Sequence, residues 1–192
     1  MIRKFFWALR ALVYKPFFDK FELPSYIGKP IYIGNFKRIF INKRVRIFPG
    51  ARIEVINEKS SIIFEDNISI GQHFHIISKG ELIIGKGTTI SANVLITNVD
   101  HEYQDIGKHI LEQPLIIKET QIGENCFIGY GAVIQAGTIL GKQCIVGSNA
   151  IVRGVFKDYS VIVGVPARVV KRYDVEKKIW QKTNKQGEFI DE

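Results

Sequence analysis

The sequence lacks several features that would assign a protein class at once. It has no run of about 18 or more apolar residues, and its N-terminus lacks the apolar stretch and small-residue cleavage site of a signal peptide. It has only two cysteines, Cys126 and Cys144, and neither lies in a CxxC pair or beside a histidine at metal-ligand spacing. We therefore expect a cytoplasmic protein without a membrane-spanning helix, a disulfide framework or a bound metal.

Signatures of nucleic-acid binding are also missing. No RNP, KH, zinc-finger or helix-turn-helix pattern occurs, and the aromatic residues are not interleaved with basic residues on one stretch. The net charge of +8 and the isoelectric point near 9.5 predict attraction to anions, so we expect a membrane surface or a phosphorylated small molecule rather than nucleic acid. At 192 residues, 46% of them apolar, the chain suits one domain with a sizeable core.

What the sequence does contain is a six-residue repeat. From Ile122 onward an aliphatic residue returns at every sixth position, and a small or short side chain follows four positions after each of the first five. The aliphatic residues are Ile122, Ile128, Ile134, Leu140, Val146 and Val152, and the small ones are Cys126, Ala132, Thr138, Cys144 and Ala150. This pattern predicts a parallel β-helix in which three hexads, roughly 18 residues, make one triangular coil. Both cysteines are then expected to fill small inward positions.

The repeat extends toward the N-terminus with two kinds of irregularity. Its phase is found again at Ile41, Ile47, Ile53, Ile84, Ile90 and Ile96. Between residues 54 and 83 the phase slips, which we interpret as corner bulges within one continuous solenoid of residues 21–167. Residues 102–115 leave the repeat altogether, and this excursion loop ends in Pro114, which cannot donate to a strand ladder. Because the coil around it is rigid, the excursion loop is the expected location of function.

The two ends of the chain have other patterns. Residues 1–20 form a separate N-terminal unit, in which residues 2–15 have the periodicity of an amphipathic helix ended by Pro16. Its apolar arc consists of Ile2, Phe5, Phe6, Leu9, Leu12 and Val13. Two interpretations stay open: a cap over the open end of the coil, or a helix lying in the interface of an anionic membrane. For residues 168–192 we predict a last strand, a short charged helix and a tail.

A histidine stands at the start of the excursion loop. His101 lies in "NVDHEYQD", directly after Asp100, and His109 follows eight residues later. A neutral imidazole, with a pKa of about 6.5, is the side chain best suited to take a proton from a hydroxyl near pH 7. His101 is therefore a candidate general base.

Three sequence features together resemble the hexapeptide-repeat acyltransferases. They are the hexads "IGENCFIGYGAVIQAGTILGKQCIVGSNAIV", the loop with a histidine at its start, and the closing "VIVGVPARVVKR". Within this family the chain is similar to the sugar O-acetyltransferases, which include galactoside and maltose acetyltransferases and the capsule and lipopolysaccharide acetyltransferases. The resemblance covers about residues 27–172. It implies a left-handed coil, a homotrimer with active sites in the clefts between neighbouring coils, and acetyl-CoA as the acetyl donor.

The resemblance also implies roles for individual residues. His101 matches the family's general base, whereas His109 matches no family position and is expected to be an exposed loop residue. The backbone N–H of Tyr130 matches the donor that stabilises the tetrahedral oxyanion.

Other positions match the family's coenzyme A site. Ser148 is expected to pair with the pantetheine arm through its backbone. Arg168 and Lys171, with Arg172 beside them, match the residues that meet the 3′-phosphate end. Phe127 stands where many members have tryptophan, so an aromatic side chain is kept near the acyl group while the indole hydrogen bond is lost.

The acceptor is expected to be a sugar hydroxyl in capsule, O-antigen or other surface polysaccharide biosynthesis. His73 matches a position where sugar-acetylating relatives often have asparagine, and His75 points to the same side of its strand. Asn98 and Asp100 lead into the excursion loop and are candidates for orienting His101 or for touching the acceptor.

Three alternative functions stay open. An N-acetyltransferase acting on a nucleotide-linked amino-sugar would share the fold. A zinc enzyme of the γ-carbonic anhydrase type is the second, although the histidine spacing does not resemble that class. A non-catalytic β-helix scaffold is the third, although a purely structural coil would not need a histidine-bearing excursion. Stoichiometric zinc in the purified protein would favour the second.

Overall fold

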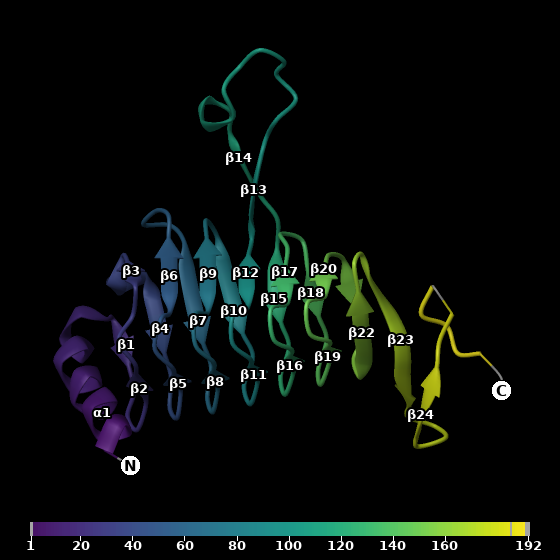
Figure 1. Ribbon diagram of the computed structural model, residues 1–192, viewed down its shortest axis with the longest axis horizontal. Coiled ribbons are helices and arrows are strands. Elements are labelled where there is room, and N and C mark those ends of the chain that lie inside the picture. The colour runs from purple at the N-terminus through teal and green to yellow at the C-terminus, as the bar shows by residue number, and fades with distance from the viewer. Residues whose placement is uncertain (1, 185, 191–192) are drawn as a thin grey trace.

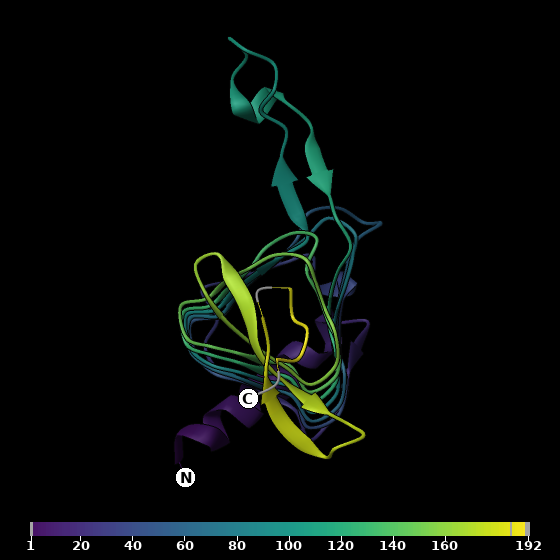
Figure 2. The ribbon, with the colours of Figure 1, turned by 90° about the vertical axis from the view of Figure 1, so that its right-hand side faces the viewer.

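The computed structural model describes residues 2–184 and 186–190. The chain winds into a left-handed parallel β-helix, with α1 (Ile2–Tyr14) at its N-terminal end and antiparallel strands at its C-terminal end (Figures 1 and 2). Each full coil contributes one short strand to each of three faces, so the fold predicted from the hexads is confirmed. In the described part of the chain, no helix has the length and apolar character needed to cross a membrane.

Three sheets form the faces of the coil. Sheet 1 consists of β1 (Lys20–Phe21), β4 (Ile39–Ile41), β7 (Ser61–Phe64), β10 (Glu81–Ile84), β15 (Thr120–Ile122), β18 (Ile139–Leu140) and β21 (Val155–Phe156). Sheet 2 consists of β2 (Tyr26–Ile27), β5 (Arg46–Ile47), β8 (Ser69–Ile70), β11 (Thr89–Ile90), β16 (Phe127–Ile128), β19 (Ile145–Val146), β22 (Ser160–Gly164), β23 (Ala167–Asp174) and β24 (Ile179–Lys182). Sheet 3 consists of β3 (Tyr32–Gly34), β6 (Arg52–Val55), β9 (His75–Ser78), β12 (Leu95–Thr97), β17 (Val133–Ile134) and β20 (Ile151–Val152). Short 3₁₀ turns lie at Lys15–Phe17 and Phe36–Arg38.

The inward residues of the repeat form one continuous core. The predicted aliphatic positions from Ile122 to Val152 are all buried, and Cys126 and Cys144 fill small inward positions as free thiols. The neighbouring Cys144 and burial raise the pKa of the Cys126 thiol, which makes it a poor nucleophile. The cysteines are therefore packing residues, as predicted.

The phase slips arise because the coils differ in length. Phe127 pairs with Ile145, which gives the expected 18 residues per coil, but Ser69 pairs with Thr89 after 20. The extra residues lengthen the strands at the corner between sheets 3 and 1: β9 and β10 have four residues each, whereas β17 and β18 have two each. The solenoid is continuous, and its parallel registers are regular there, so the slips reflect a longer corner rather than a bulged strand.

The N-terminal helix covers the end of the coil with a face that the sequence did not predict. Ala11 is buried, and the Trp7 ring lies 5.9 Å and 5.3 Å from the rings of Tyr26 and Phe48. The predicted apolar arc faces away: Phe5, Phe6, Leu9, Leu12 and Val13 are 49–67% exposed. The side chain of Ile2 lies outside the described part. The helix packs on the coil through Trp7 and Tyr14, because these rings meet aromatic rings of the first coils.

The C-terminal segment corrects a second expectation. Residues 168–192 were expected to include a short charged helix, but β23 and β24 pair as an antiparallel hairpin on β22, and no helix occurs among the described residues there. The rings of Tyr173 and Trp180 lie 5.6 Å apart. Aromatic and β-branched residues favour strands, and the open edge of β22 supplies a partner.

Candidate active site

The excursion loop is carried on a two-stranded ribbon that projects from the coil (Figures 1 and 2). β13 (Val99–His101) pairs antiparallel with β14 (Leu115–Ile117) instead of continuing the coil. Beyond the ribbon, the buried Gln113 side chain bonds to the backbone of Asp105 and Lys108. His109 is exposed, as expected, and its Nδ1 accepts from Leu111 N at 3.2 Å, at the start of the 3₁₀ turn Ile110–Glu112. The loop is thus internally braced.

His101 is the last residue of β13 and is partly exposed. Its Cα partner across the ribbon is Leu115, and its backbone N–H donates to Asp100 Oδ1 at 3.0 Å. Its ring Nδ1 is buried and has no hydrogen-bond partner among the described residues. A general base of this kind is normally oriented through its second ring nitrogen. The single chain therefore holds the backbone of His101 and leaves its ring without an orienting partner.

Asp100 fixes the ribbon to the coil and makes no hydrogen bond to the His101 ring within the described structure. Besides accepting from His101 N, its carboxylate lies 3.7 Å from Arg153 Nη2 and 4.0 Å from Lys118 Nζ. These contacts link the ribbon to Lys118, directly after β14, and to Arg153, directly after β20. A contact between Asp100 and the acceptor stays a prediction.

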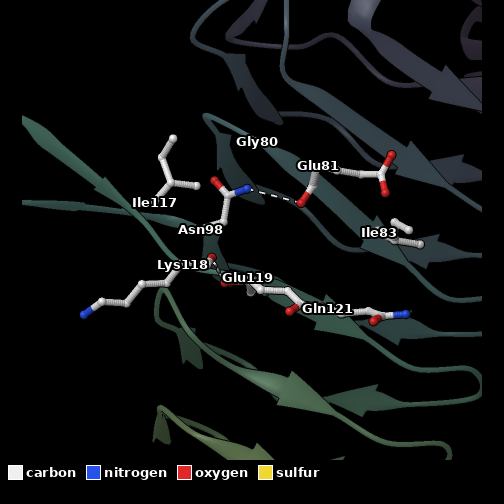
Figure 3. Close-up of a pocket in the computed structure, with 9 residues that line it drawn as sticks. Gly80, Glu81, Ile83, Asn98, Ile117, Lys118, Glu119 and Gln121 are labelled. Atoms are coloured by element: carbon white, nitrogen blue, oxygen red, sulfur yellow. Dashed lines mark hydrogen bonds between the residues drawn. The ribbon is translucent and has the colours of Figure 1, made fainter.

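Asn98 is buried at the corner where the ribbon leaves the coil. Its Oδ1 accepts from Lys79 N at 2.9 Å, and its Nδ2 donates to Ser78 Oγ at 3.1 Å and to Glu81 O at 3.3 Å. Figure 3 shows the side chain between Ile117 and Glu81, at the edge of a cavity of about 380 Å³. Because its amide is fully used inside the protein, the structure gives Asn98 a bracing role, and acceptor binding by it stays a prediction.

We predict that Asn98→Ala lowers the free energy of unfolding by about 1–3 kcal/mol, because it leaves buried polar partners unpaired. Urea denaturation of the purified variant measures this. Asn42→Ala is the matched control, since the Asn42 side chain makes no hydrogen bond in the described structure and its Oδ1 is buried unpaired. Equal stability of the two variants would contradict the bracing role.

The corner between sheets 2 and 3 presents a row of unused backbone donors. Gln72, Ala92, Tyr130 and Ser148 occupy the same place in successive coils, and none of their N–H groups donates a hydrogen bond within the described structure. At the corner between sheets 1 and 2, carboxylates cap three of the equivalent N–H groups. There Lys43 N donates to Asp66, Lys86 N to Glu65 and Lys142 N to Asp158. The uncapped corner is therefore able to bind a ligand through its backbone.

Two aromatic side chains flank this row. Phe127 is 41% exposed on the outer face of sheet 2, and Tyr130 is 51% exposed at the corner. The Tyr130 hydroxyl accepts from Asn93 Nδ2 at 2.6 Å, which fixes the phenol along the coil edge. Both predicted residues thus lie next to the free N–H groups of Tyr130 and Ser148.

The predicted basic residues lie on the β22–β23 hairpin and divide into two kinds. Arg168 and Lys171 are exposed, and Arg168 Nη1 donates a hydrogen bond to its neighbour, Ala167 O, at 2.9 Å. Arg172 is half-buried: it donates to Gly187 O at 3.3 Å and stacks over the Phe189 ring at 5.3 Å. Arg168 and Lys171 are therefore available to an anion, whereas Arg172 holds the C-terminal segment.

The predicted acceptor histidines differ in their surroundings. His73 is an exposed corner residue with φ of 54°, and its ring lies over Gly50, where an added Cβ would be 2.5 Å from Nδ1. His75 Nε2 lies 2.7 Å from Glu54 Oε1, and Arg52 also bonds to that carboxylate at 2.6 Å. The Arg52 hydrogen bond holds the pKa of Glu54 below its usual range. This Arg52–Glu54–His75 cluster was not predicted, because the lengths of the coils between these residues cannot be read from the sequence.

One chain does not bring the predicted base and oxyanion donor together. Tyr130 and Ala92 share the corner where sheet 3 begins, and His101 lies beyond its other end. From Ala92 to Thr97 a strand spans roughly 16 Å, and His101 is four residues further on. A site that used both groups would therefore need His101 and the Tyr130 corner from different chains, or a large movement of the loop. No group of His, Cys, Asp and Glu side chains in the described chain could hold a metal.

Comparison with known proteins assigns the family. Residues 119–154 match the family model "Bacterial transferase hexapeptide (six repeats)". The chain is 32% identical over 163 residues to the "Putative lipopolysaccharide biosynthesis O-acetyl transferase WbbJ" of Escherichia coli, covering 80% of this chain and 81% of the relative.

Solved structures share the fold. The N-acyltransferase AntD from Bacillus cereus, in complex with dTDP and 3-hydroxybutyryl-CoA, superposes with a TM-score of 0.71 at 16% identity, covering 88% of this chain and 90% of that one. Galactoside acetyltransferase in complex with coenzyme A gives a TM-score of 0.53 at 17% identity, covering 95% and 78%. The sequence identity to WbbJ and the shared coil show that the chain belongs to the hexapeptide-repeat acyltransferase family.

Proposed function

We propose that the protein transfers an acetyl group from acetyl-CoA to a sugar hydroxyl in surface polysaccharide biosynthesis. The observation that carries this proposal is the row of free N–H groups at the corner between sheets 2 and 3, flanked by Phe127 and closed by exposed arginine and lysine side chains. An extended pantetheine arm with a phosphorylated end is complementary to such a row. The WbbJ relative, whose name specifies lipopolysaccharide O-acetyl transfer, supports a sugar acceptor.

In the proposed reaction, the His101 imidazole takes the proton from the acceptor hydroxyl. The hydroxyl oxygen attacks the thioester carbonyl, and the Tyr130 N–H donates to the oxyanion that forms. Collapse of the tetrahedral intermediate breaks the C–S bond, and the imidazolium returns the proton to the departing thiolate. A backbone donor needs no particular side chain, so tyrosine at this position is compatible with the role.

Coenzyme A binding in this proposal uses the coil edge. The Ser148 N–H pairs with the pantetheine arm, Phe127 packs beside the acyl end, and Arg168 and Lys171 bind the 3′-phosphate. Arg172 supports the hairpin from behind, because its guanidinium is already engaged with Gly187 and Phe189. His73 and His75 would lie on the acceptor side.

The proposed assembly is a homotrimer with active sites between chains. Two observations support it: His101 and the Tyr130 corner lie at opposite ends of sheet 3, and the loop presents exposed apolar side chains. Tyr103, Ile106 and Leu111 are 71%, 97% and 74% exposed in the single chain. Burying them on a neighbouring coil would stabilise the loop and supply surroundings for the His101 ring. For location we propose the cytoplasm, with residues 2–15 contacting the inner face of the plasma membrane.

The test is release of coenzyme A from acetyl-CoA across a panel of capsule-type oligosaccharides, free sugars and nucleotide amino-sugars. We predict acceptor-dependent turnover with a hydroxyl acceptor, and a base-labile ester in the product by mass spectrometry. Turnover only with amino-sugars, giving a base-stable amide, would replace the proposal with N-acetyl transfer. Absence of turnover with every acceptor, by protein that binds acetyl-CoA, would contradict it.

A further inference from the structure

The outer face of α1 is an unpartnered apolar surface. The exposed residues Phe5, Phe6, Leu9, Leu12 and Val13 continue into Phe17 and Leu23, which are 58% and 43% exposed. A cavity of about 270 Å³ between the helix and the following turn is lined by Ala8, Leu12, Leu23, Pro24, Ser25 and Tyr26. We call Phe5, Phe6, Leu9, Leu12, Val13, Phe17 and Leu23 the α1 surface. A contiguous apolar surface of this kind marks an interaction site.

Capping the coil does not explain this surface. Capping uses the opposite side of the helix, where Trp7, Ala11 and Tyr14 contact the first coils. The N-terminal half of α1 also extends past the triangular outline of the coil (Figure 2). The helix is therefore built with a second apolar side that the described chain leaves uncovered.

The charge of the chain is concentrated at the same end. Residues 1–46 contain 11 Lys and Arg against two Asp and Glu, whereas residues 47–192 contain 16 against 17. The first 18 residues have no acidic side chain. Lys15, Lys20, Lys37, Lys43 and Arg44 are exposed in this region. The excess of positive charge thus lies at the N-terminal end of the coil, which carries the α1 surface, and does not extend along the coil.

The apolar α1 surface and the basic residues at the same end of the chain together indicate one kind of binding partner. A second copy docked through the same surface would bring two strongly basic ends together, which like charge opposes. A convex apolar helix with basic surroundings fits the interface of an anionic bilayer, where apolar side chains enter the acyl boundary and the basic ones stay among the headgroups. With 13 residues, α1 is only about 20 Å long, short of the roughly 30 Å hydrocarbon core, so it lies in the interface.

We infer that the α1 surface inserts into the interface of an anionic lipid bilayer, with the coil standing end-on and its N-terminal end toward the membrane. This inference deepens the proposed location and does not depend on acetyl transfer. In this orientation the first coils determine how far the excursion loop and the coil edge lie above the membrane surface. The sugar of an acceptor glycan attached to a membrane lipid would extend into the region that the excursion loop and the coil edge occupy.

The test uses the full chain and vesicles without acetyl-CoA or acceptor. We predict co-sedimentation with vesicles of phosphatidylcholine containing about 30% phosphatidylglycerol, weak binding to phosphatidylcholine alone, and loss of binding as salt is raised. Val13→Glu is expected to weaken the binding about tenfold or more, because it places a charge at the acyl boundary.

Val175→Glu is the matched control, since it makes the same change in charge and side chain at the other end of the coil, where Val175 is 65% exposed. It should bind like the wild type, and circular dichroism should show both variants folded. Equal binding by the two variants, or no binding of wild type to anionic vesicles, would overturn the inference. Concentration-dependent self-association abolished by Val13→Glu would also overturn it and assign the surface to a second copy. Acetyl transfer to a soluble acceptor should be the same in both variants, so failure here is separable from failure of the proposed function.

Discussion

His101→Ala is expected to lower kcat for acetyl transfer by about 10²–10⁴-fold while the β-helix stays folded, because the imidazole supplies general-base catalysis and little packing. His101 is at the end of the ribbon and outside the buried core, and its backbone contacts with Asp100 and Leu115 survive the change. The KM for acetyl-CoA should move little, since the residues proposed to bind it lie at another corner. Steady-state kinetics with circular dichroism measure both quantities.

His109→Ala is the matched control for this experiment. It lies in the same loop, is exposed, and its ring caps only the 3₁₀ turn at Ile110–Glu112. It should keep more than half of the wild-type kcat. If His101→Ala retained more than about a tenth of the wild-type rate, the general-base assignment would be wrong. If both histidine variants lost activity equally, the loop as a whole would be the functional unit.

The fold was predictable because burial has a period. The hexads place Ile122, Ile128 and Ile134 on successive inward positions, and a coil that buries two residues in every six repeats the same sequence pattern in every turn. The excursion was predictable for the converse reason, since a ribbon held by Asn98 and Asp100 outside the core has no inward positions to fill.

Other features of the structure have no corresponding periodic pattern in the sequence. The α1 periodicity shows that one side of the helix is apolar, but it does not show whether protein, lipid or solvent covers that side, and the face covered by the coil is the one with Trp7 and Ala11. The free N–H groups of Tyr130 and Ser148 belong to the backbone, so the residue types at these positions do not indicate that the groups are free. Only the family resemblance identified these two positions. The Glu54–His75 contact depends on a coil length that the hexad period does not reveal.

Mixed assemblies offer the second large effect, because the two halves of the proposed site lie at opposite ends of sheet 3. One variant is His101→Ala, which keeps the coenzyme A corner. The other is the double variant Arg168→Glu/Lys171→Glu, which keeps His101 and loses two charge-assisted contacts to the 3′-phosphate. Each alone should have about 1% or less of wild-type activity at acetyl-CoA concentrations well below KM.

Hetero-oligomers that contain both variants, co-expressed with different affinity tags and purified through both, are expected to recover about one third of wild-type activity. Whichever variant is in the majority, a cyclic trimer of both kinds contains one interface that pairs an intact His101 from one chain with an intact coenzyme A corner from the next. If the loop instead folded back onto its own coil, each active site would consist of His101 and the coenzyme A corner of the same chain. Every site in the mixed assembly would then lack either His101 or the two basic side chains of the corner. Activity no greater than that of the single variants would therefore place the site within one chain, whereas the one-third recovery requires that the excursion loop of each chain serve its neighbour.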